Sequence, residues 1–571
     1  MKNSEVAQVF QDIADLLELK GETLFKVRAY QKAVRSIEHL PVELAQLTKE
    51  GKLREVPGIG DAIEKKIVEL LTTGRLKYYE DLRSEFPEGI ISLLQVPGIG
   101  PKTAMRLSTE LGIKSLEDLE AAIVDGRVVG LSRLGEKTAE NILRHLRSVR
   151  TKEQRIPIGT ALPLAEDIMM SLQQHSQIRN LTPAGSLRRF NETIGDIDLM
   201  GTADDGEAVI AAFTRLPQVK EVLAKGGTKA SVVTHRDLQV DLRVVEHDAF
   251  GSLLQYFTGS KQHNIVLRER GQRQGLKLSE YGITDLQNGR LEKFAAEEDF
   301  YHRLGLQFIP PELREGQHEI ERAAENSIPE LLGISDIKGD LHIHTEWSDG
   351  RDSIEAMATG ARNLGYQYIA VTDHSRGLGI AHGLNEERLR EQMLEIGRLN
   401  ERLEGIHILT GTEVDIRADG SLDFADELLR ELDVVIAAVH SSMGQDQDRM
   451  TQRVLRAIEN PHVDMIAHPT CRLLGQREPV ALDSETVFRA AAQTGTALEI
   501  NAMPDRLDLR DIHIFRAREL GVKLALGTDA HSTEHLLYMR FGMGMARRGW
   551  CEAKHILNTL SVEEVLASLA Q

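Results

Sequence analysis

From residue 337 to the C-terminus, short apolar runs with β character alternate regularly with runs of helical spacing. Such alternation predicts a parallel sheet or barrel, because each helix carries the chain back to start the next strand in the same direction. The carboxyl ends of parallel strands meet at one mouth of a barrel. Histidines and carboxylates stand at these ends or in the loops that follow: His342, His344, Asp349, His374, Glu413, His440, His468, Asp529 and His531.

Taken together, these nine side chains predict a metal centre. Any one of the histidines alone would more often be a structural residue. Nitrogen and carboxylate ligands without thiolates suit Mn²⁺, Zn²⁺ or Fe²⁺. Divalent cations would also offset part of the net charge of −19, whose acidity is concentrated toward the C-terminal end of the chain.

A second acidic cluster lies in the middle of the chain. Asp196 and Asp198 are one residue apart on an extended run, so their side chains point to the same face of a strand. Two carboxylates so close repel each other, and a pair of divalent cations would reward the arrangement. Asp241 interrupts an otherwise apolar run and qualifies as a third carboxylate from a neighbouring strand. A solvated Asp-x-Asp on an edge strand is the alternative.

The turn just upstream of this cluster has the chemistry of an anion site. Residues 185–189 read Gly-Ser-Leu-Arg-Arg and offer backbone N–H groups, a hydroxyl and two guanidinium groups. These donors suit a polyphosphate. A two-metal site, with ions roughly 3.5–4 Å apart, is a common way to catalyse phosphoryl transfer. The middle of the chain is therefore predicted to transfer a phosphoryl group.

Residues 1–150 read as short helices, and one pentapeptide recurs within them. Val-Pro-Gly-Ile-Gly stands at 56–60 and again at 96–100, each time before a helix-like run. A Gly-hydrophobe-Gly turn that opens a helix leaves N–H groups at the positive end of the helix dipole, which suits a phosphate. Two ordinary helix-start turns are the alternative. The candidate contacts to a DNA backbone are Gly58, Gly60, Gly98 and Gly100.

Gross composition sets further limits on the class of protein. A chain of 571 residues is too long to fold around a single hydrophobic core, and about three to five domains are expected. No apolar run approaches the ~18–20 residues of a membrane span, and the first residues are not typical of a signal peptide. With only Cys471 and Cys551, a reducing cytosol fits and structural disulfides are not expected. We therefore expect a cytoplasmic protein without a membrane partner.

The motifs of residues 1–315, in their order, resemble the family X DNA polymerases of the DNA polymerase beta type. The matching pieces are the Gly-Ser-x-Arg-Arg turn, the Gly-Asp-x-Asp strand, the later lone Asp, a Tyr-Phe-Thr-Gly-Ser turn at 256–260, and paired helix-hairpin-helix motifs upstream. The resemblance implies that Asp196 and Asp198 bind two metals, Mg²⁺ or Mn²⁺. It implies that Asp241 binds the catalytic metal and accepts the proton of the primer 3′-hydroxyl.

The same resemblance implies a set of nucleotide contacts. Ser186 and Arg189 would hold the β- and γ-phosphates, Tyr256 and Phe257 would shape the sugar pocket beside the backbone of Gly259, Asn264 would touch the base edge, and Arg268 the template side. Lys261 and Gln239 differ from the residues of the vertebrate enzyme at these positions. Nucleotide affinity and the tuning of Asp241 are therefore not carried over.

Lys66 lies on the helix after the first hairpin. In the family X polymerases, a lysine at this position acts as the Schiff-base nucleophile of a deoxyribose-phosphate lyase. An ordinary surface lysine is the commoner explanation, and from sequence alone it is the interpretation we favour. By the same resemblance, the helix-hairpin-helix motifs would bind Na⁺ or K⁺.

The block from residue 337 onward resembles the PHP (polymerase and histidinol phosphatase) domain, a distorted seven-stranded α/β barrel with a trinuclear metal centre. By that resemblance, His342, His344, Glu413 and Asp529 hold one metal, Glu413, His440 and His468 the second, and Asp349, His374 and His531 the third. The implied chemistry is hydrolysis of phosphoesters by water that the metals activate. Beside a polymerase, the implied substrates are DNA 3′ ends, for a 3′–5′ exonuclease, or abasic sites, for an AP endonuclease or 3′-phosphodiesterase.

We therefore expect a multidomain α+β and α/β chain that acts as a gap-filling DNA polymerase and a nuclease. The expected parts are a helical helix-hairpin-helix domain at 1–80, a second at 81–150, a nucleotidyltransferase palm with a mixed sheet at 151–255, a nucleotide- and template-binding subdomain at 256–318, a linker at 319–336 and a PHP barrel at 337–571. The expected partners are gapped or primer-template DNA and deoxynucleoside triphosphates, bound by a monomer.

Two other functions remain open at this point. One is a PHP nuclease whose polymerase-like half only binds DNA, and the intact set of three aspartates speaks against it. The other is a repair scaffold whose C-terminal metal site serves stability alone.

Overall fold

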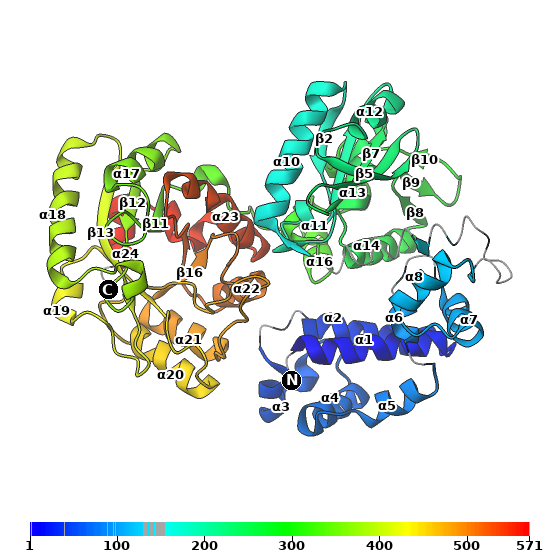
Figure 1. The fold of residues 1–571 in the computed structure, drawn as a ribbon, viewed down its shortest axis with the longest axis horizontal. Helices are drawn as coiled ribbons and strands as arrows, with labels where there is room; N and C mark the ends of the chain where they lie inside the picture. Colours follow the sequence, from blue (N-terminus) through cyan, green and yellow to red (C-terminus); the bar gives the residue numbers. More distant parts are fainter. Residues whose placement is uncertain are drawn as a thin grey trace. The chain divides into compact units, whose positions relative to one another are not determined.

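The computed structural model describes residues 1–571 except positions 2, 39, 41, 88, 95, 97, 98, 129–134, 136–138, 140, 141, 144–154, 570 and 571. The candidate contact Gly98 lies outside the described residues. The chain forms two compact units, Met1–Arg155 with Asp237–Gln239, and Ile156–Arg236 with Val240–Gln571. Figure 1 shows the elements of each unit.

The first unit is helical, as its sequence predicts. Residues Val6, Phe10, Ile13 and Leu17 recur at helical spacing and are fully buried, because α1 packs against α2 along this stripe. The helices are α1 (Asn3–Leu19), α2 (Leu24–Glu38), α3 (Leu44–Lys49), α4 (Asp61–Thr73), α5 (Lys77–Ser84), α6 (Ile90–Leu94), α7 (Pro101–Leu111) and α8 (Leu116–Val124).

The second unit begins with a mixed sheet of five strands in the order β2-β4-β7-β6-β5. Strand β4 runs parallel to β7 and antiparallel to β2. Along β7, buried and half-buried residues alternate strictly, so one face of this strand packs into the core. The elements are α10 (Ile158–His175), β2 (Arg179–Pro183), α11 (Gly185–Arg188), β4 (Ile197–Thr202), α12 (Gly206–Phe213), β5 (Val219–Lys225), β6 (Lys229–Thr234) and β7 (Gln239–Val245).

A smaller helical and antiparallel layer follows the mixed sheet. Its core contains Leu267, Phe300 and Tyr301 and extends to Ile320 and Ile328, which lie in the range predicted as a linker. The elements are α13 (Phe250–Thr258), α14 (Lys261–Arg273), β8 (Leu276–Ser279), β9 (Gly282–Asp285), β10 (Leu291–Glu292), α15 (Glu297–Arg303), the 3₁₀ helix η3 (Pro311–Leu313) and α16 (Glu319–Ala324).

The rest of the second unit is a seven-stranded sheet whose strands follow one another in chain order and pair in parallel. A parallel bridge between Ile343 and Ala530 joins the end of the first strand to the residues after the last, so the sheet nearly closes. The strands are β11 (Gly339–Ile343), β12 (Tyr368–Val371), β13 (His407–Asp415), β14 (Val434–Ala438), β15 (Met465–Ile466), β16 (Ala497–Asn501) and β17 (Leu524–Gly527).

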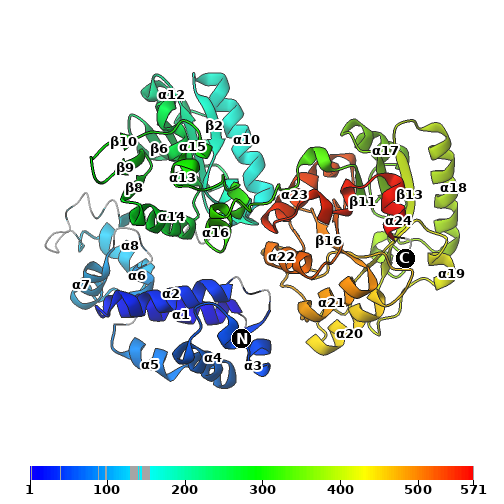
Figure 2. The same cartoon turned by 180° about the vertical axis from the view of Figure 1, so that it is seen from behind.

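Helices surround this barrel, which Figure 2 shows from behind. Apart from β13, its strands are buried along their whole length, as expected where side chains fill the inside and helices cover the outside. The surrounding helices include α17 (Ile354–Asn363), α18 (Glu386–Arg402), α20 (Gln447–Ile458), α21 (Ser484–Thr494), α22 (Asp511–Glu519), α23 (Met539–Arg548) and α24 (Val562–Leu569). Together with the helical domain and the mixed sheet, this barrel confirms the predicted fold class.

Among the described residues, we find no helix that is both long and apolar enough to cross a membrane.

Candidate active sites

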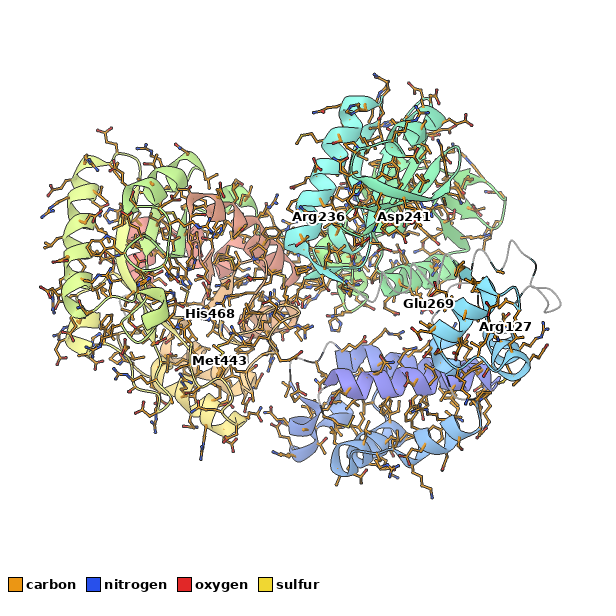
Figure 3. All side chains as sticks on the ribbon, viewed as in Figure 1. Arg127, Arg236, Asp241, Glu269, Met443 and His468 are labelled. Atoms are coloured by element: carbon orange, nitrogen blue, oxygen red, sulfur yellow. The ribbon has the colours of Figure 1, made fainter. Side chains whose placement is uncertain are left out.

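The structure brings the three aspartates of the mixed sheet together. Asp198 on β4 and Asp241 on β7 are direct partners in the parallel register of the two strands, so their side chains share a face. Asp196 lies two residues before Asp198 and continues that face. All three side chains are half-buried, and Figure 3 marks Asp241 among the strands of this sheet. The arrangement suits divalent metals that must also contact a substrate.

Gly185 packs the anion-binding turn directly onto this carboxylate pair. Its φ is +58°, and a Cβ atom at this position would lie 2.4 Å from Oδ2 of Asp198. Only glycine meets both conditions without strain. Ser186, the next residue, therefore lies beside the acidic cluster.

The two arginines of the turn have different partners. Arg188 donates to Oγ1 of Thr258 at 2.7 Å and to Oε2 of Glu297 at 2.6 Å. Burial alone would raise the pKa of the Glu297 carboxyl, but Arg314 and Arg188 outweigh burial and hold that pKa below its usual value. Arg188 is thus held by a buried ion pair with Glu297.

Arg189 joins the two turns that the sequence singled out. Its Nη1 donates to the carbonyl oxygen of Thr258 at 2.7 Å, and its Nε donates to Oε1 of Glu315 at 3.2 Å. Gly259 follows with φ of +69°, and a Cβ atom there would lie 3.2 Å from Nη1 of Arg189. The anion-binding turn at 185–189 and the turn at 256–260 therefore meet at the guanidinium group of Arg189.

The remaining candidate nucleotide contacts lie on α13 and α14. Asn264 donates to the carbonyl oxygen of Tyr256 at 2.7 Å and accepts a hydrogen bond from Gln255. Arg268 donates to the carbonyl oxygen of Asn264. The rings of Tyr256 and Phe257 lie 5.2 Å apart in an edge-to-face arrangement. In this structure the amide of Asn264 orders the end of α13.

In the barrel, the structure gathers all nine candidate ligands. Three groups have potential ligand atoms within 4.8 Å of one another: His344, Asp349, His374 and His531; His342, His344 and Asp529; and His374, Glu413 and His440. His468, which Figure 3 labels, has its Nε2 2.9 Å from Oε1 of Glu413. These groups differ from the predicted sets in two residues. His344 also lies beside Asp349, His374 and His531, and His374 also lies beside Glu413 and His440.

The chemistry of these donors fits metal ions. Nε2 of His342 and Nε2 of His344 are 3.0 Å apart, and Nδ1 of His374 is 2.8 Å from Oε2 of Glu413. Ligands that bind one ion at about 2.0–2.2 Å lie roughly 3 Å from one another. Among the described residues, the buried atoms without a hydrogen-bond partner include Nδ1 of His344, Nδ1 of His374, Nδ1 of His468 and Oε2 of Glu413.

The electrostatics of the barrel site also favour cations. Burial alone would raise the pKa of the Glu413 carboxyl, but His440, His374 and His342 outweigh it and hold that pKa well below its usual range. Burial opposes protonation of His440, yet Glu413 and Asp415 outweigh it and raise the pKa of His440 to about 9. The carboxylates thus stabilise positive charge, which divalent ions would supply.

Buried acceptors behind the imidazoles were not singled out from the sequence. Nδ1 of His342 is 2.7 Å from Oε1 of Glu499, and Nδ1 of His440 is 2.6 Å from Oδ1 of Asp415. Such a carboxylate holds an imidazole in one tautomer with its other nitrogen free for a metal. Glu499 and Asp415 could have been found by the signal that indicated Asp241, because both are acidic residues in strand-like runs.

In the helical unit, two candidate glycines stand at helix starts. Gly60 and Gly100 are the N-cap residues of α4 and α7, and neither helix has a side-chain cap that would occupy its first N–H groups. Gly58 has φ of +90°. This arrangement agrees with the predicted phosphate contacts.

Lys66 lies on α4, half-buried, with Nζ 4.6 Å from the centre of the Tyr78 ring. Its Nζ also donates to the carbonyl oxygen of Ala62 at 3.3 Å. Burial lowers the pKa of this amine. A lowered pKa is what a Schiff-base nucleophile needs, because the neutral amine is the reactive form.

Four families match separate parts of the chain. Residues 1–76 match a helix-hairpin-helix domain, and residues 90–148 match a SAM-like helix-hairpin-helix tandem. Residues 253–315 match the DNA polymerase beta thumb, and residues 340–502 match the PHP domain.

Individual proteins are similar to the whole chain or to part of it. A protein of Bacillus subtilis (strain 168) named "DNA polymerase/3′-5′ exonuclease PolX" is 41% identical over 571 residues, which is 100% of this chain and 99% of that protein. A protein of Thermoanaerobacter sp. (strain X514) named a "Probable phosphatase" is 35% identical over 205 residues, 34% of this chain and 78% of that protein. DNA polymerase lambda of Arabidopsis thaliana is 25% identical over 345 residues, 55% of this chain and 62% of that protein.

Proposed function

This chain belongs to the family X DNA polymerases that carry a C-terminal PHP domain, and from that premise we propose that it extends DNA primers at one site and degrades DNA 3′ ends at another. The observation that carries the proposal is the presence of two complete and separate ligand sets. Asp196, Asp198 and Asp241 share one face of the mixed sheet, whereas the nine candidate ligands of the barrel converge elsewhere. The substrates are gapped or primer-template DNA and deoxynucleoside triphosphates.

In polymerisation, Asp196 and Asp198 would hold two ions of Mg²⁺ or Mn²⁺, and Asp241 would bind one of them. Ions held there would neutralise the charge that develops on the transferring phosphoryl group. Asp241 accepts the proton of the primer 3′-hydroxyl. The donors of Ser186 and Arg189 orient the triphosphate, and this positioning supplies much of the rate.

The other nucleotide contacts complete the pocket. Tyr256, Phe257 and the backbone of Gly259 shape the sugar site, Asn264 touches the base edge and Arg268 the template side.

In hydrolysis, the barrel ligands would hold three ions of Mn²⁺, Zn²⁺ or Fe²⁺, which activate water for attack on a phosphoester. The chain's own contribution is to keep the imidazoles in the ligating tautomer, through Glu499 behind His342 and Asp415 behind His440. A 3′-terminal phosphodiester is the substrate. Because an abasic site presents the same phosphodiester bond, AP endonuclease or 3′-phosphodiesterase activity belongs to the same proposal.

The helical unit supplies affinity for the DNA backbone. The N–H groups at Gly58, Gly60, Gly98 and Gly100 would bind phosphates without reading bases, with Na⁺ or K⁺ at the hairpins. We propose that the protein works as a monomer in the cytoplasm.

The experiment compares Asp198→Ala with His344→Ala in the full chain. Each variant is incubated with a labelled primer on a gapped template and Mn²⁺, with and without nucleotides. We expect Asp198→Ala to lose extension and keep degradation, and His344→Ala to do the reverse. If either substitution removed both activities while the protein stayed folded, the division into two sites would be refuted.

The same assay discriminates the two other functions. Wild-type protein that degrades but never extends would be a nuclease with a DNA-binding half. Wild-type protein that binds metal but cleaves neither 3′ ends nor abasic sites would be a scaffold.

A further inference from the structure

The barrel half of the second unit contacts the turn at residues 185–192, and a buried arginine on α23 makes several of these contacts. Arg548 is the last residue of α23, and its side chain is only 8% exposed. Its Nη1 donates to the carbonyl oxygen of Arg189 at 2.7 Å and to Oδ1 of Asn191 at 2.8 Å. Its Nε and Nη2 donate to Oδ2 of Asp511, at 2.9 Å and 2.5 Å. An arginine from the barrel thus fixes the backbone that carries Arg189.

Glu315 links the two arginine side chains. Its Oε1 accepts from Nη1 of Arg548 at 2.9 Å and from Nε of Arg189 at 3.2 Å. The Arg189 side chain is therefore held at its Nε end by Glu315 and at Nη1 by the carbonyl oxygen of Thr258. Both the main chain and the side chain of Arg189 depend on contacts that Arg548 stabilises.

The neighbouring surface is shaped to receive the same turn. Phe190 has φ of +61°, and its ring lies 6.2 Å from the ring of Phe541. Phe541 precedes Arg548 by about two turns of α23. A Cβ atom on Gly544 would lie 2.1 Å from the Phe190 ring, so a glycine is needed where the ring meets the helix. Phe541, Gly544 and Arg548 occupy one face of α23 by their spacing.

The contact continues beyond α23. Arg472, from the barrel, forms a two-pronged ion pair with Glu192, three residues after Arg189, at 3.0 Å and 2.9 Å. Its side chain is 4% exposed, so this pair is desolvated and geometrically demanding. The turn from Arg189 to Glu192 is thus held from the barrel side at several successive residues.

We propose that Arg548 is a positioning residue for polymerisation, through which the nuclease half builds part of the triphosphate site. The inference rests on the proposed function, because it assumes that Arg189 binds the triphosphate. Without Arg548, the backbone of Arg189 and the carboxylate of Glu315 each lose a charge-assisted hydrogen bond. The Arg189 guanidinium then loses its fixed place, and nucleotide binding weakens before chemistry does.

The test uses Arg548→Met and Arg548→Lys in the full chain, with steady-state primer extension over a range of nucleotide concentrations. We expect Arg548→Met to raise the KM for the nucleotide roughly tenfold with a smaller change in kcat, about the effect of losing one hydrogen bond to a charged group. Arg548→Lys restores the charge without the fork of donors, so an intermediate KM is expected. Affinity for primer-template DNA and 3′-end degradation should stay unchanged.

Arg540→Met is the matched control. Arg540 lies on the same helix and also contacts the mixed-sheet half, through an ion pair with Glu166. Among the described residues, none of its hydrogen bonds or ion pairs reaches the 185–192 turn. We expect its nucleotide KM to equal that of the wild type. A KM that rose equally in Arg540→Met would reduce the effect to general loosening of the contact and would overturn the inference.

Two further results separate this inference from the proposed function. If wild-type protein extended primers and Arg548→Met kept a wild-type nucleotide KM, the positioning role alone would be refuted. If wild-type protein did not extend primers at all, the proposed polymerase function would fail first. Thermal unfolding of each variant establishes that a changed KM does not come from unfolded protein.

Discussion

The carboxylate behind His342 offers a sharp test of the barrel centre. Glu499 is fully buried and accepts hydrogen bonds on both oxygens: Oε1 lies 2.7 Å from Nδ1 of His342, and Oε2 accepts from the backbone N–H of His468 at 2.6 Å. Oε2 also accepts from Nδ2 of Asn501 at 3.2 Å. The perturbation is Glu499→Gln, which keeps the size of the side chain. A glutamine has only one accepting oxygen, so it cannot accept hydrogen bonds on both sides of the side chain.

The expected loss of metal affinity follows from the missing accepting oxygen. One buried donor left without an acceptor costs about 1–3 kcal/mol. If the amide nitrogen faces His342, the ring turns to the tautomer with its proton on Nε2, the nitrogen that faces His344 at 3.0 Å. At 1.4 kcal/mol per factor of ten, metal affinity should fall roughly 5- to 150-fold. Loss of comparable partners behind metal ligands costs about 10- to 100-fold.

The assay measures bound Mn²⁺ after dialysis at fixed free metal, together with 3′-end degradation and primer extension. We expect metal content and degradation to fall in Glu499→Gln, with degradation recovering at high Mn²⁺, while extension stays at the wild-type level. Glu459→Gln, the same change at an exposed position of the barrel, should alter neither activity. Unchanged Mn²⁺ content and degradation in Glu499→Gln would refute the argument that this carboxylate sets the tautomer of His342.

Three further predictions follow from single residues. Gly185→Ala places a methyl group 2.4 Å from Oδ2 of Asp198 at a residue whose φ is +58°. Primer extension should therefore fall roughly 100-fold while 3′-end degradation stays intact, and extension equal to that of the wild type would contradict the close contact. Burial raises the pKa of Asp464 to about 7, so the free energy of unfolding of the wild type should decline as pH rises from about 4 through 7. Relative to Asp464→Asn, the decline should be about 2–4 kcal/mol in urea titrations, and parallel pH profiles of the two proteins would contradict the raised pKa. Sodium borohydride should trap a covalent complex between the wild-type protein and DNA that carries a 5′-deoxyribose phosphate, but Lys66→Ala should not be trapped. Lys65→Ala, at an exposed neighbouring lysine, is the control and should be trapped like the wild type. No trapping of the wild type would mean that Lys66 is an ordinary lysine.

Local patterns in the sequence were sufficient for the fold class and the family. The regular strand and helix alternation after residue 337 predicts a parallel sheet or barrel. In the structure the strands follow one another in chain order and form a nearly closed barrel. The Asp196 and Asp198 spacing specifies one face of a strand through the two-residue period of β structure. Such patterns are readable because they depend on neighbours along the chain.

Contacts between distant residues were decided only by the tertiary structure. Glu499 and Asp415 each stand in a strand like many other acidic residues, and nothing in the sequence shows which imidazole will lie beside them. The same holds for Arg548, whose partners Arg189 and Glu315 are hundreds of residues away. A hydrogen bond acts over about 3 Å in space, whatever the separation in sequence. The sequence therefore determined which catalytic groups each half of the second unit contains. Packing determined which other side chains orient those groups and which residues of the two halves contact each other.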